Sequence, residues 1–131
     1  MGFLIQKAEG GIVPAFEYLP ASAITPKIGL ALKLDTGKLA VASGTDKPEF
    51  ISMTERDSAV TAGDIIPVIR VTEDITFAVP AQAAQTSVNI GTKVTLHTDG
   101  MQVTATATSG TAEIVGREGT AAGDIQYVRF R

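Results

Sequence analysis

Apolar and polar residues alternate along several short runs of this chain, and the clearest run surrounds an Asp-Gly pair. Over residues 94–107, every second residue before and after the turn at Asp99 and Gly100 belongs to one largely apolar face, with Thr98 as its polar member. A period of two residues is typical of a strand with one buried face, and Asp-Gly suits the positive φ angles of a two-residue type I′ turn. The segment therefore predicts a β-hairpin with Leu96 opposite Val103.

The same pattern predicts a second hairpin over residues 30–41. Leucines alternate with polar or small residues on both sides of a four-residue turn, which runs from Asp35 to Lys38 and contains Gly37. Residues 65–71 are apolar at nearly every position, which favours a central strand, although Pro67 lacks a backbone donor and indicates a free edge or a bulge. Short strands at this even spacing are typical of an all-β domain.

The order of these elements occurs twice. Residues 28–71 and 90–131 both begin with Ile-Gly, pass a turn with aspartate and glycine and a Ser-Gly-Thr triplet, and end in a closing strand after Ala-Gly-Asp-Ile. Glycine supplies an unusual φ angle in such a turn, and aspartate caps backbone N–H groups. The turn residues are Gly63 and Asp64 in the first copy and Gly123 and Asp124 in the second. We therefore predict a compact β-barrel or β-sandwich of two related β units, in a single domain over residues 27–131.

Residues 1–26 lie outside this repeat, and glycines and prolines interrupt them too often for a long helix, so we expect an extended N-terminal arm. The arm carries large apolar side chains, which are rare in disordered tails. Either they complete the core of their own domain, or some of them dock onto a partner or another subunit. The candidate contact residues are Phe3, Ile5, Phe16, Tyr18 and Leu19. Residues 78–86 are small and are expected to form a flexible surface linker between the two copies.

Composition and charge narrow the classes of function. The 131 residues have a formal net charge of −3, which disfavours a nucleic-acid footprint. The chain has no cysteine, which removes disulfides and thiol chemistry. Apolar runs stay below the roughly 18 residues of a membrane span, and no signal peptide is recognisable. We expect a soluble protein with neither nucleic acid nor membrane among its partners.

Candidate chemistry is sparse. The Asp-Thr-Gly triplet at residues 35–37 matches the signature of retropepsin-like aspartic proteases, in which two aspartates, one from each subunit, share a proton. Lys38 follows where a small apolar residue is needed, however, no Gly-rich flap comes after it, and a hairpin turn accounts for the same residues. His97, the sole histidine, falls on a polar strand face without partners for a metal. The sequence therefore predicts no catalytic, cofactor-binding or metal-binding residue, and a homodimeric aspartic protease remains an alternative.

Four segments of the chain share order and texture with a known family. They are residues 6–20 (Gln6-Lys7-Ala8-Glu9-Gly10-Gly11 and then Pro14-Ala15-Phe16-Glu17-Tyr18-Leu19-Pro20), residues 47–53, residues 62–70 and residues 93–100. Through these segments nearly the whole chain resembles the small capsid decoration, or cement, proteins of tailed bacteriophages and prophages. None of the segments is a catalytic motif.

The resemblance implies a β-rich structural protein of the virion, made in the cytoplasm of the bacterial host and added to the capsid exterior. It also implies a homotrimer that clamps neighbouring subunits of the major capsid protein and so helps the shell to resist internal DNA pressure. A head or tail fibre adaptor, which would use the same β scaffold for another virion contact, is a further alternative. An acidic chain with an apolar arm and no active-site motif agrees with such a structural role.

Overall fold

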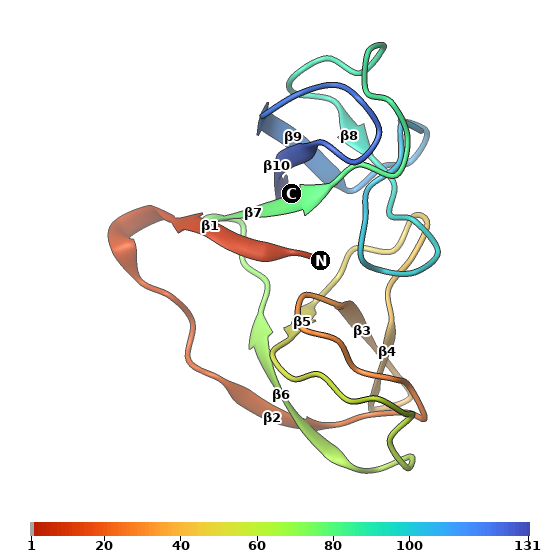
Figure 1. Cartoon of the computed structure of the whole chain (residues 1–131). Helices are drawn as coiled ribbons and strands as arrows, with labels where there is room; N and C mark the ends of the chain where they lie inside the picture. Colours follow the sequence, from red (N-terminus) through yellow and green to blue (C-terminus); the bar gives the residue numbers. More distant parts are fainter. Residues whose placement is uncertain (1) are drawn as a thin grey trace.

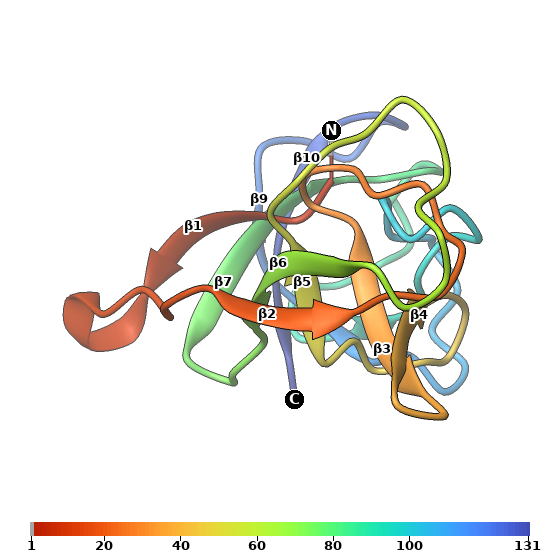
Figure 2. The same cartoon turned by 90° about the horizontal axis from the view of Figure 1, so that it is seen from below.

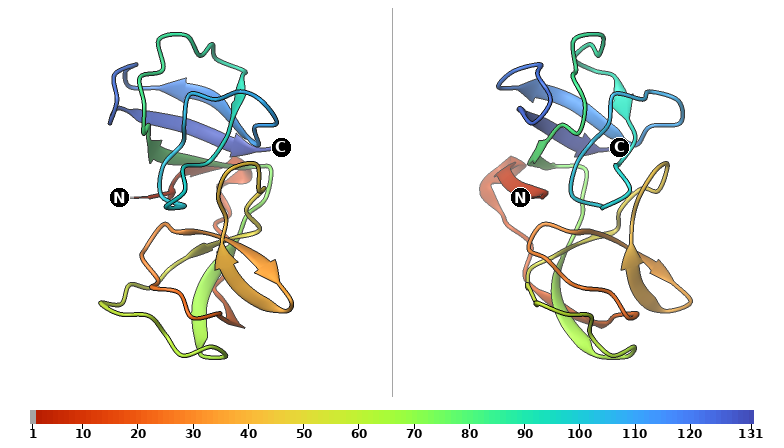
Figure 3. Two further views of the ribbon diagram at one scale, coloured as in Figure 1. Left: turned by 90° about the vertical axis from the view of Figure 1, so that its right-hand side faces the viewer. Right: turned by 45° about the vertical axis from the view of Figure 1, so that its right-hand side comes forward.

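The computed structural model describes residues 2–131, so residue 1 of the expected arm lies outside the described residues. The strands form two five-stranded antiparallel sheets that pack together, one above the other in Figure 1 and in both views of Figure 3. Within residues 2–131 neither sheet closes into a barrel. The all-β class is confirmed, and of the two expected architectures the chain adopts a compact β-sandwich.

Each sheet collects strands from separate parts of the chain. Sheet A contains β1 (Leu4–Ala8), β7 (Ile75–Pro80), β10 (Ile125–Phe130), β9 (Ala112–Arg117) and β8 (Lys93–Val94), in this spatial order. Sheet B contains β2 (Glu17–Pro20), β6 (Ile65–Arg70), β5 (Phe50–Ser52), β3 (Ala31–Asp35) and β4 (Lys38–Val41), also in spatial order. A 3₁₀ turn, η1 (Glu9–Gly11), lies between β1 and β2, where the chain first passes from sheet A to sheet B.

The hairpin expected over residues 30–41 is formed by β3 and β4. Leu32 lies opposite Val41 and Leu34 lies opposite Leu39, as the alternation predicts. Thr36 and Gly37 both have positive φ angles, of 49° and 82°. Two such residues make a type I′ turn, whose twist matches that of the strands.

The second expected hairpin has a different turn. Leu96 does lie opposite Val103, but the two-residue turn at Asp99 and Gly100 is wrong: the His97 N–H donates to Gln102 across a four-residue loop. The loop takes its shape from sheet B, because the Gly100 carbonyl accepts a hydrogen bond from the Ala31 N–H of β3. A Cβ on Gly100 would lie 2.8 Å from a methyl group of Val41, so only glycine allows this approach.

Pro67 lies in the middle of β6, a central strand of sheet B as expected. Its missing donor does not interrupt the sheet, because the paired residues of β5 end at Ser52, which lies opposite Val68. The carbonyl of Pro67 still accepts a hydrogen bond from the Met53 N–H beyond the end of β5.

The two sheets repeat one set of backbone contacts. β2 pairs with β6 as β7 pairs with β10, with Glu17 opposite Val68 and Phe77 opposite Val128. In the turns before β6 and β10, an aspartate accepts a bond from a backbone N–H three residues earlier and a glycine N–H donates to an alanine carbonyl. These bonds are Thr61 N–Asp64 Oδ2 (3.0 Å), Gly63 N–Ala21 O (2.8 Å), Ala121 N–Asp124 Oδ2 (3.0 Å) and Gly123 N–Ala81 O (2.7 Å).

The matching contacts include strands that precede the two sequence copies, residues 28–71 and 90–131. By register, β2 corresponds to β7, β3 to β8, β5 to β9 and β6 to β10. One matching strand of the first unit therefore lies before residue 28, and one of the second unit lies before residue 90. Whether residues 28–71 and 90–131 superpose over their whole length stays a prediction.

The N-terminal segment supplies one edge strand to each sheet. β1 runs along the outer edge of β7, with Leu4 opposite Ala78 and Ile5 opposite Phe77, and β2 runs along β6. β1 has no counterpart among the described strands of sheet B.

The expected flexible linker over residues 78–86 is wrong. Its first residues belong to β7, which lies between β1 and β10, and Val79, Ala81 and Gln85 are buried. The Gln85 side chain donates from Nε2 to the Thr104 carbonyl at 2.9 Å.

Buried side chains form two clusters. The first fills the inner face of sheet A and continues onto Ala31, Ile51 and Ile69 of sheet B, which joins the two sheets. The second lies within sheet B, around Leu32 and Phe50.

Candidate binding surface

The first apolar side chain of the N-terminal segment is part of the core. Phe3 is 1% exposed, and its ring centroid lies 6.4 Å from that of Phe77 and 5.4 Å from that of Phe130. Ile5 is half-buried against the same cluster, and Leu19 is half-buried against the core of sheet B. Phe3 therefore completes the chain's own domain, which was one of the two interpretations open from the sequence.

The other two candidates of the segment lie on the surface. Phe16 is 49% exposed and Tyr18 is 66% exposed. Ile12 and Val13, in the loop between η1 and β2, are 77% and 58% exposed. Figure 2 shows this loop projecting from the body of the molecule. Together with Ile65, these residues define what we call the β2 surface.

Backbone geometry explains why these side chains point outward. Tyr18 lies opposite Pro67 on β6, and Ile65 follows on the same face, because side chains two positions apart on a strand share a face. Nearer to sheet A this face is covered, since Ile69 is buried there. On these two strands the β2 surface is therefore the part of the sheet-A-facing side of sheet B that sheet A leaves uncovered.

Ile12, Val13 and Ile65 were missed by the sequence reasoning. A signal for the first two existed, because two exposed apolar residues stand between the Gly10-Gly11 pair and Pro14, where a turn is expected and burial is not. Ile65 carried no such signal, since it begins an apolar strand whose other residues are mostly buried.

An ion pair holds β2 to β6 on the opposite face. Arg70 donates from Nε to Glu17 Oε2 at 3.0 Å and from Nη2 to Glu17 Oε1 at 2.9 Å, and its guanidinium lies 4.8 Å from the ring centroid of Phe50. The hydrogen bonds that Arg70 donates to this carboxylate raise the pKa of Arg70 above its already high value. Bidentate geometry fixes both side chains although both are partly exposed.

The expected turn residues lie in turns or directly beside them, at separate places in the chain. Asp35 ends β3 and Gly37 lies in the exposed β3–β4 turn, while the glycine-aspartate pairs 63–64 and 123–124 form the turns that precede β6 and β10. Among residues 2–131, no three His, Cys, Asp or Glu side chains come together in a metal-binding group.

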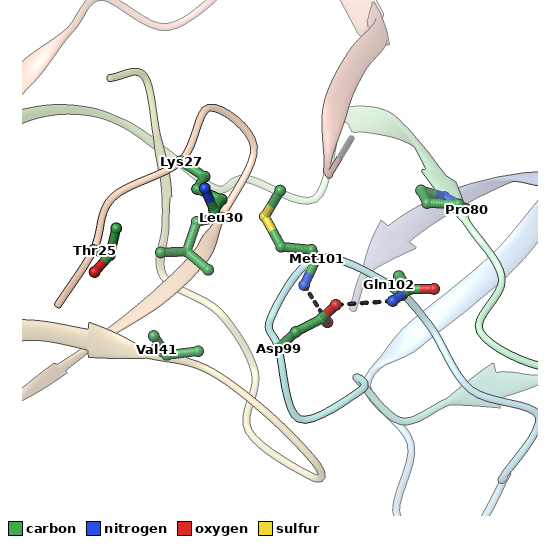
Figure 4. A pocket seen from close by; sticks show the side chains of 8 residues that line it. All are labelled: Thr25, Lys27, Leu30, Val41, Pro80, Asp99, Met101 and Gln102. Carbon is green, nitrogen blue, oxygen red and sulfur yellow. Dashed lines mark hydrogen bonds between the residues drawn. The ribbon is translucent and has the colours of Figure 1, made fainter. Parts of the chain in front are cut away.

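A pocket of about 500 Å³ lies at the junction of the two sheets (Figure 4). Asp99 is its one acidic side chain, and both of its oxygens are already used: Oδ1 accepts from the Met101 N–H at 2.9 Å and Oδ2 accepts from Gln102 at 2.8 Å. Asp99 therefore shapes its own loop. The remaining wall combines the apolar side chains of Leu30, Val41, Pro80 and Met101 with the polar side chains of Thr25, Lys27 and Gln102.

The outer face of sheet A carries a shallow hollow whose cations are paired. Arg129 bonds to Glu9, and Arg131 lies 3.2 Å from Glu113. Tyr127 donates a hydrogen bond to Glu118, which raises the pKa of the phenol. This face offers little uncompensated charge to an anion.

Across the described residues, no helix has the length and apolar character that a membrane crossing requires. No protein-family model matches the chain, and the search of curated proteins gives no match.

Proposed function

We propose that the chain is a structural virion protein that binds the outside of a phage capsid and stabilises it by clamping subunits of the major capsid protein. The observation that carries the proposal is the β2 surface: exposed apolar side chains on β2, at the start of β6 and in the loop that leads into β2. Exposed apolar groups gathered on one surface are typical of protein–protein contact sites.

The resemblance to capsid decoration proteins supports the same surface. Residues 6–20, one of the segments that carry the resemblance, include Ile12, Val13, Phe16 and Tyr18. The carboxylates of Asp46, Asp64, Asp99 and Asp124 each accept a backbone hydrogen bond within their own turn, which suits a protein that acts by binding.

Rigid presentation makes a small surface effective. Burial of one aromatic anchor stabilises a complex by about 2 kcal/mol, and β2 is already ordered by its pairing with β6, so little entropy is lost on binding. In a homotrimer three such surfaces would bind as linked sites, which raises the overall affinity far above that of one.

Co-sedimentation tests this proposal. The probe is the expanded empty shell assembled from the major capsid protein of the phage or prophage that encodes the chain. We expect the chain to sediment with these shells and Val13→Asp to bind about 30-fold more weakly, because it removes about 2 kcal/mol of apolar burial. Ile90→Asp is the matched control, since Ile90 is 56% exposed but lies outside the β2 surface. A wild-type chain that stays in the supernatant at saturating shell concentrations would refute the proposal.

A further inference from the structure

Among the described strands, the two matching units differ at both edges: β4 continues sheet B beyond β3, and β1 continues sheet A beyond β7. β7 and β2 occupy corresponding places next to β10 and β6, but β1 lies along the outer edge of β7, whereas β2 is the last described strand of its sheet. Figure 1 shows β1 beside β7 at the upper sheet and β2 at the border of the lower one. The fold thus contains, within one chain, both a filled and an open version of the same edge.

The open edge offers backbone groups in a defined pattern. The Ala21 N–H donates to the Asp64 carbonyl, its partner in register, and hydrogen-bonded pairs alternate in antiparallel sheets. Glu17 and Leu19 therefore bond to β6, while the N–H and C=O groups of Phe16 and Tyr18 point away from it. No backbone hydrogen bond from elsewhere in residues 2–131 reaches these two residues.

The edge lacks most of the features that protect edge strands. Natural edges carry lysine, bulges, prolines or inward-pointing charges. β2 is short, at four residues, and ends in Pro20, but its one charged side chain, Glu17, is already paired, and Tyr18 exposes two thirds of its surface at the centre. An unprotected edge beside exposed apolar side chains is typical of a site for strand addition.

We infer that the outer edge of β2 receives an extended strand of the partner protein, antiparallel to β2, as β1 is received by β7. The inference rests on the proposed function, so the partner is the major capsid protein. The side chains along the outer edge of β2 determine which residues the added strand of the partner should carry. Residues of the added strand that face Phe16 and Tyr18 should be apolar. The residue that faces Glu17 should be basic or polar, because the ion pair of Glu17 and Arg70 stands where sheet A has the apolar pair Phe77 and Phe130.

Charge favours this occupant over a second copy of β2. Two antiparallel copies paired through this edge would bring their Glu17 side chains to the same face of one sheet, where like charges on neighbouring strands repel. A basic residue on a capsid strand would instead extend the ion pair of Glu17 and Arg70.

Hydrogen exchange with the wild-type chain tests the inference directly. In the free chain, the amides of Phe16 and Tyr18 should exchange quickly, and those of Glu17 and Leu19 slowly. Bound to expanded shells, the first two should become at least about tenfold slower, as expected for a newly formed hydrogen bond. A gain of this size indicates a new hydrogen bond at each outward amide, because contact with the side chains alone gives these amides no acceptor.

A pair of variants tests the backbone apart from the side chain. Tyr18→Ala removes the ring, and Tyr18→Pro removes the ring and the outward N–H while leaving the bonds to β6. We expect Tyr18→Pro to bind shells about tenfold more weakly than Tyr18→Ala, with Ile90→Ala unchanged. If Tyr18→Pro does not fold, as judged by its thermal melt, the exchange pattern of the wild-type chain decides alone.

The outcomes separate the two proposals. If the wild-type chain binds shells but Phe16 and Tyr18 gain no protection, strand addition is wrong and capsid binding stands. If the chain does not bind shells, the proposed function fails and this inference fails with it. Protection of the two amides that grows with chain concentration in the absence of shells would assign the edge to a second copy and overturn the inference.

Discussion

At corresponding positions, sheet A carries two phenylalanines and sheet B carries an ion pair. Phe77 and Phe130 lie with their ring centroids 5.9 Å apart in the core, while Glu17 and Arg70 form a bidentate pair that water reaches. The strands beneath them have the same register. The difference follows from what covers them, because Phe3 enters with β1 and closes the face of sheet A.

The comparison shows how one backbone pattern serves two purposes. Where a further strand brings an aromatic side chain, the face becomes core, and where no strand follows, the same positions carry charges that tolerate solvent. On one face of the sheet at this edge, the charges of Glu17 and Arg70 are already paired, and on the other face the exposed side chains are apolar. Such an edge is suited to binding a partner without loss of its own stability.

The largest effect should come from removing the cover of sheet A. Phe3→Ala should lower the free energy of unfolding by about 3–4 kcal/mol, because it leaves a cavity between Phe77 and Phe130. Glu17→Ala, in the matching region of sheet B, should lower it by less than about 1 kcal/mol, because the pair it breaks is exposed. Urea unfolding of both variants measures the two effects. Similar losses would show that the two sheets do not differ in this way.

The two matching turns should respond alike. Gly63 and Gly123 have φ angles of 98° and 90°, and a Cβ on either would meet no atom within 4 Å, so backbone strain alone determines the effect. We expect Gly63→Ala and Gly123→Ala each to destabilise the chain by about 1 kcal/mol. Thermal melts of the two single variants check the match, and a clearly larger loss in one would break the equivalence of the units.

Added salt should weaken the coupling free energy of the Glu17–Arg70 pair but not that of the Phe77–Phe130 pair. A double-mutant cycle on Glu17 and Arg70 should give a coupling of about 0.5 kcal/mol that weakens as salt is raised, because partly exposed charges are screened. The coupling of Phe77 and Phe130, measured in the same way, should not weaken with salt, because dispersion and apolar burial carry it. A salt-independent coupling of Glu17 and Arg70 would contradict the exposed character of this edge.

The smallest effect should depend on pH. Asp46 accepts hydrogen bonds from the Ser43 N–H at 3.1 Å and from Lys33 at 2.9 Å, which lower the pKa of this carboxyl below its ordinary value of 3.8. A lowered pKa in the folded state stabilises the fold above the unfolded pKa, and this gain is lost as the pH falls through the folded pKa. Because the pair is about one third exposed, Asp46→Asn should lower stability by only about 0.5 kcal/mol at pH 7.

The measurement is urea unfolding of the wild type and Asp46→Asn between pH 7 and pH 2. The difference in the free energy of unfolding should stay constant down to about pH 5. It should shrink toward zero below pH 3.8, as Asp46 of the wild type becomes protonated first in the unfolded and then in the folded state. A difference that persists at pH 2 would mean that Asp46 acts through shape and not through charge.

Local chemistry in the sequence determined the all-β class, the β3–β4 hairpin and the glycine-aspartate turns. Each of these depends on residues that are close in the chain: alternating leucines around Thr36 and Gly37, or an aspartate that caps an N–H three residues earlier. Such contacts are visible in one sequence because the residues that make them are neighbours. The Tyr18 and Phe16 side chains were likewise found as candidates, since large apolar groups in a Pro-bracketed segment are conspicuous.

Contacts between distant residues decided the rest. β1 pairs with β7 from the far end of the chain, which made Phe3 a core residue and turned an expected linker into a central strand. The loop at Asp99 and Gly100 took its shape from its bond to Ala31 of the other sheet. The open edge of β2 is also a tertiary property, because it depends on which strand lies beside it. Edge pairing uses backbone groups that every residue carries, so no single stretch of sequence shows which edges are filled.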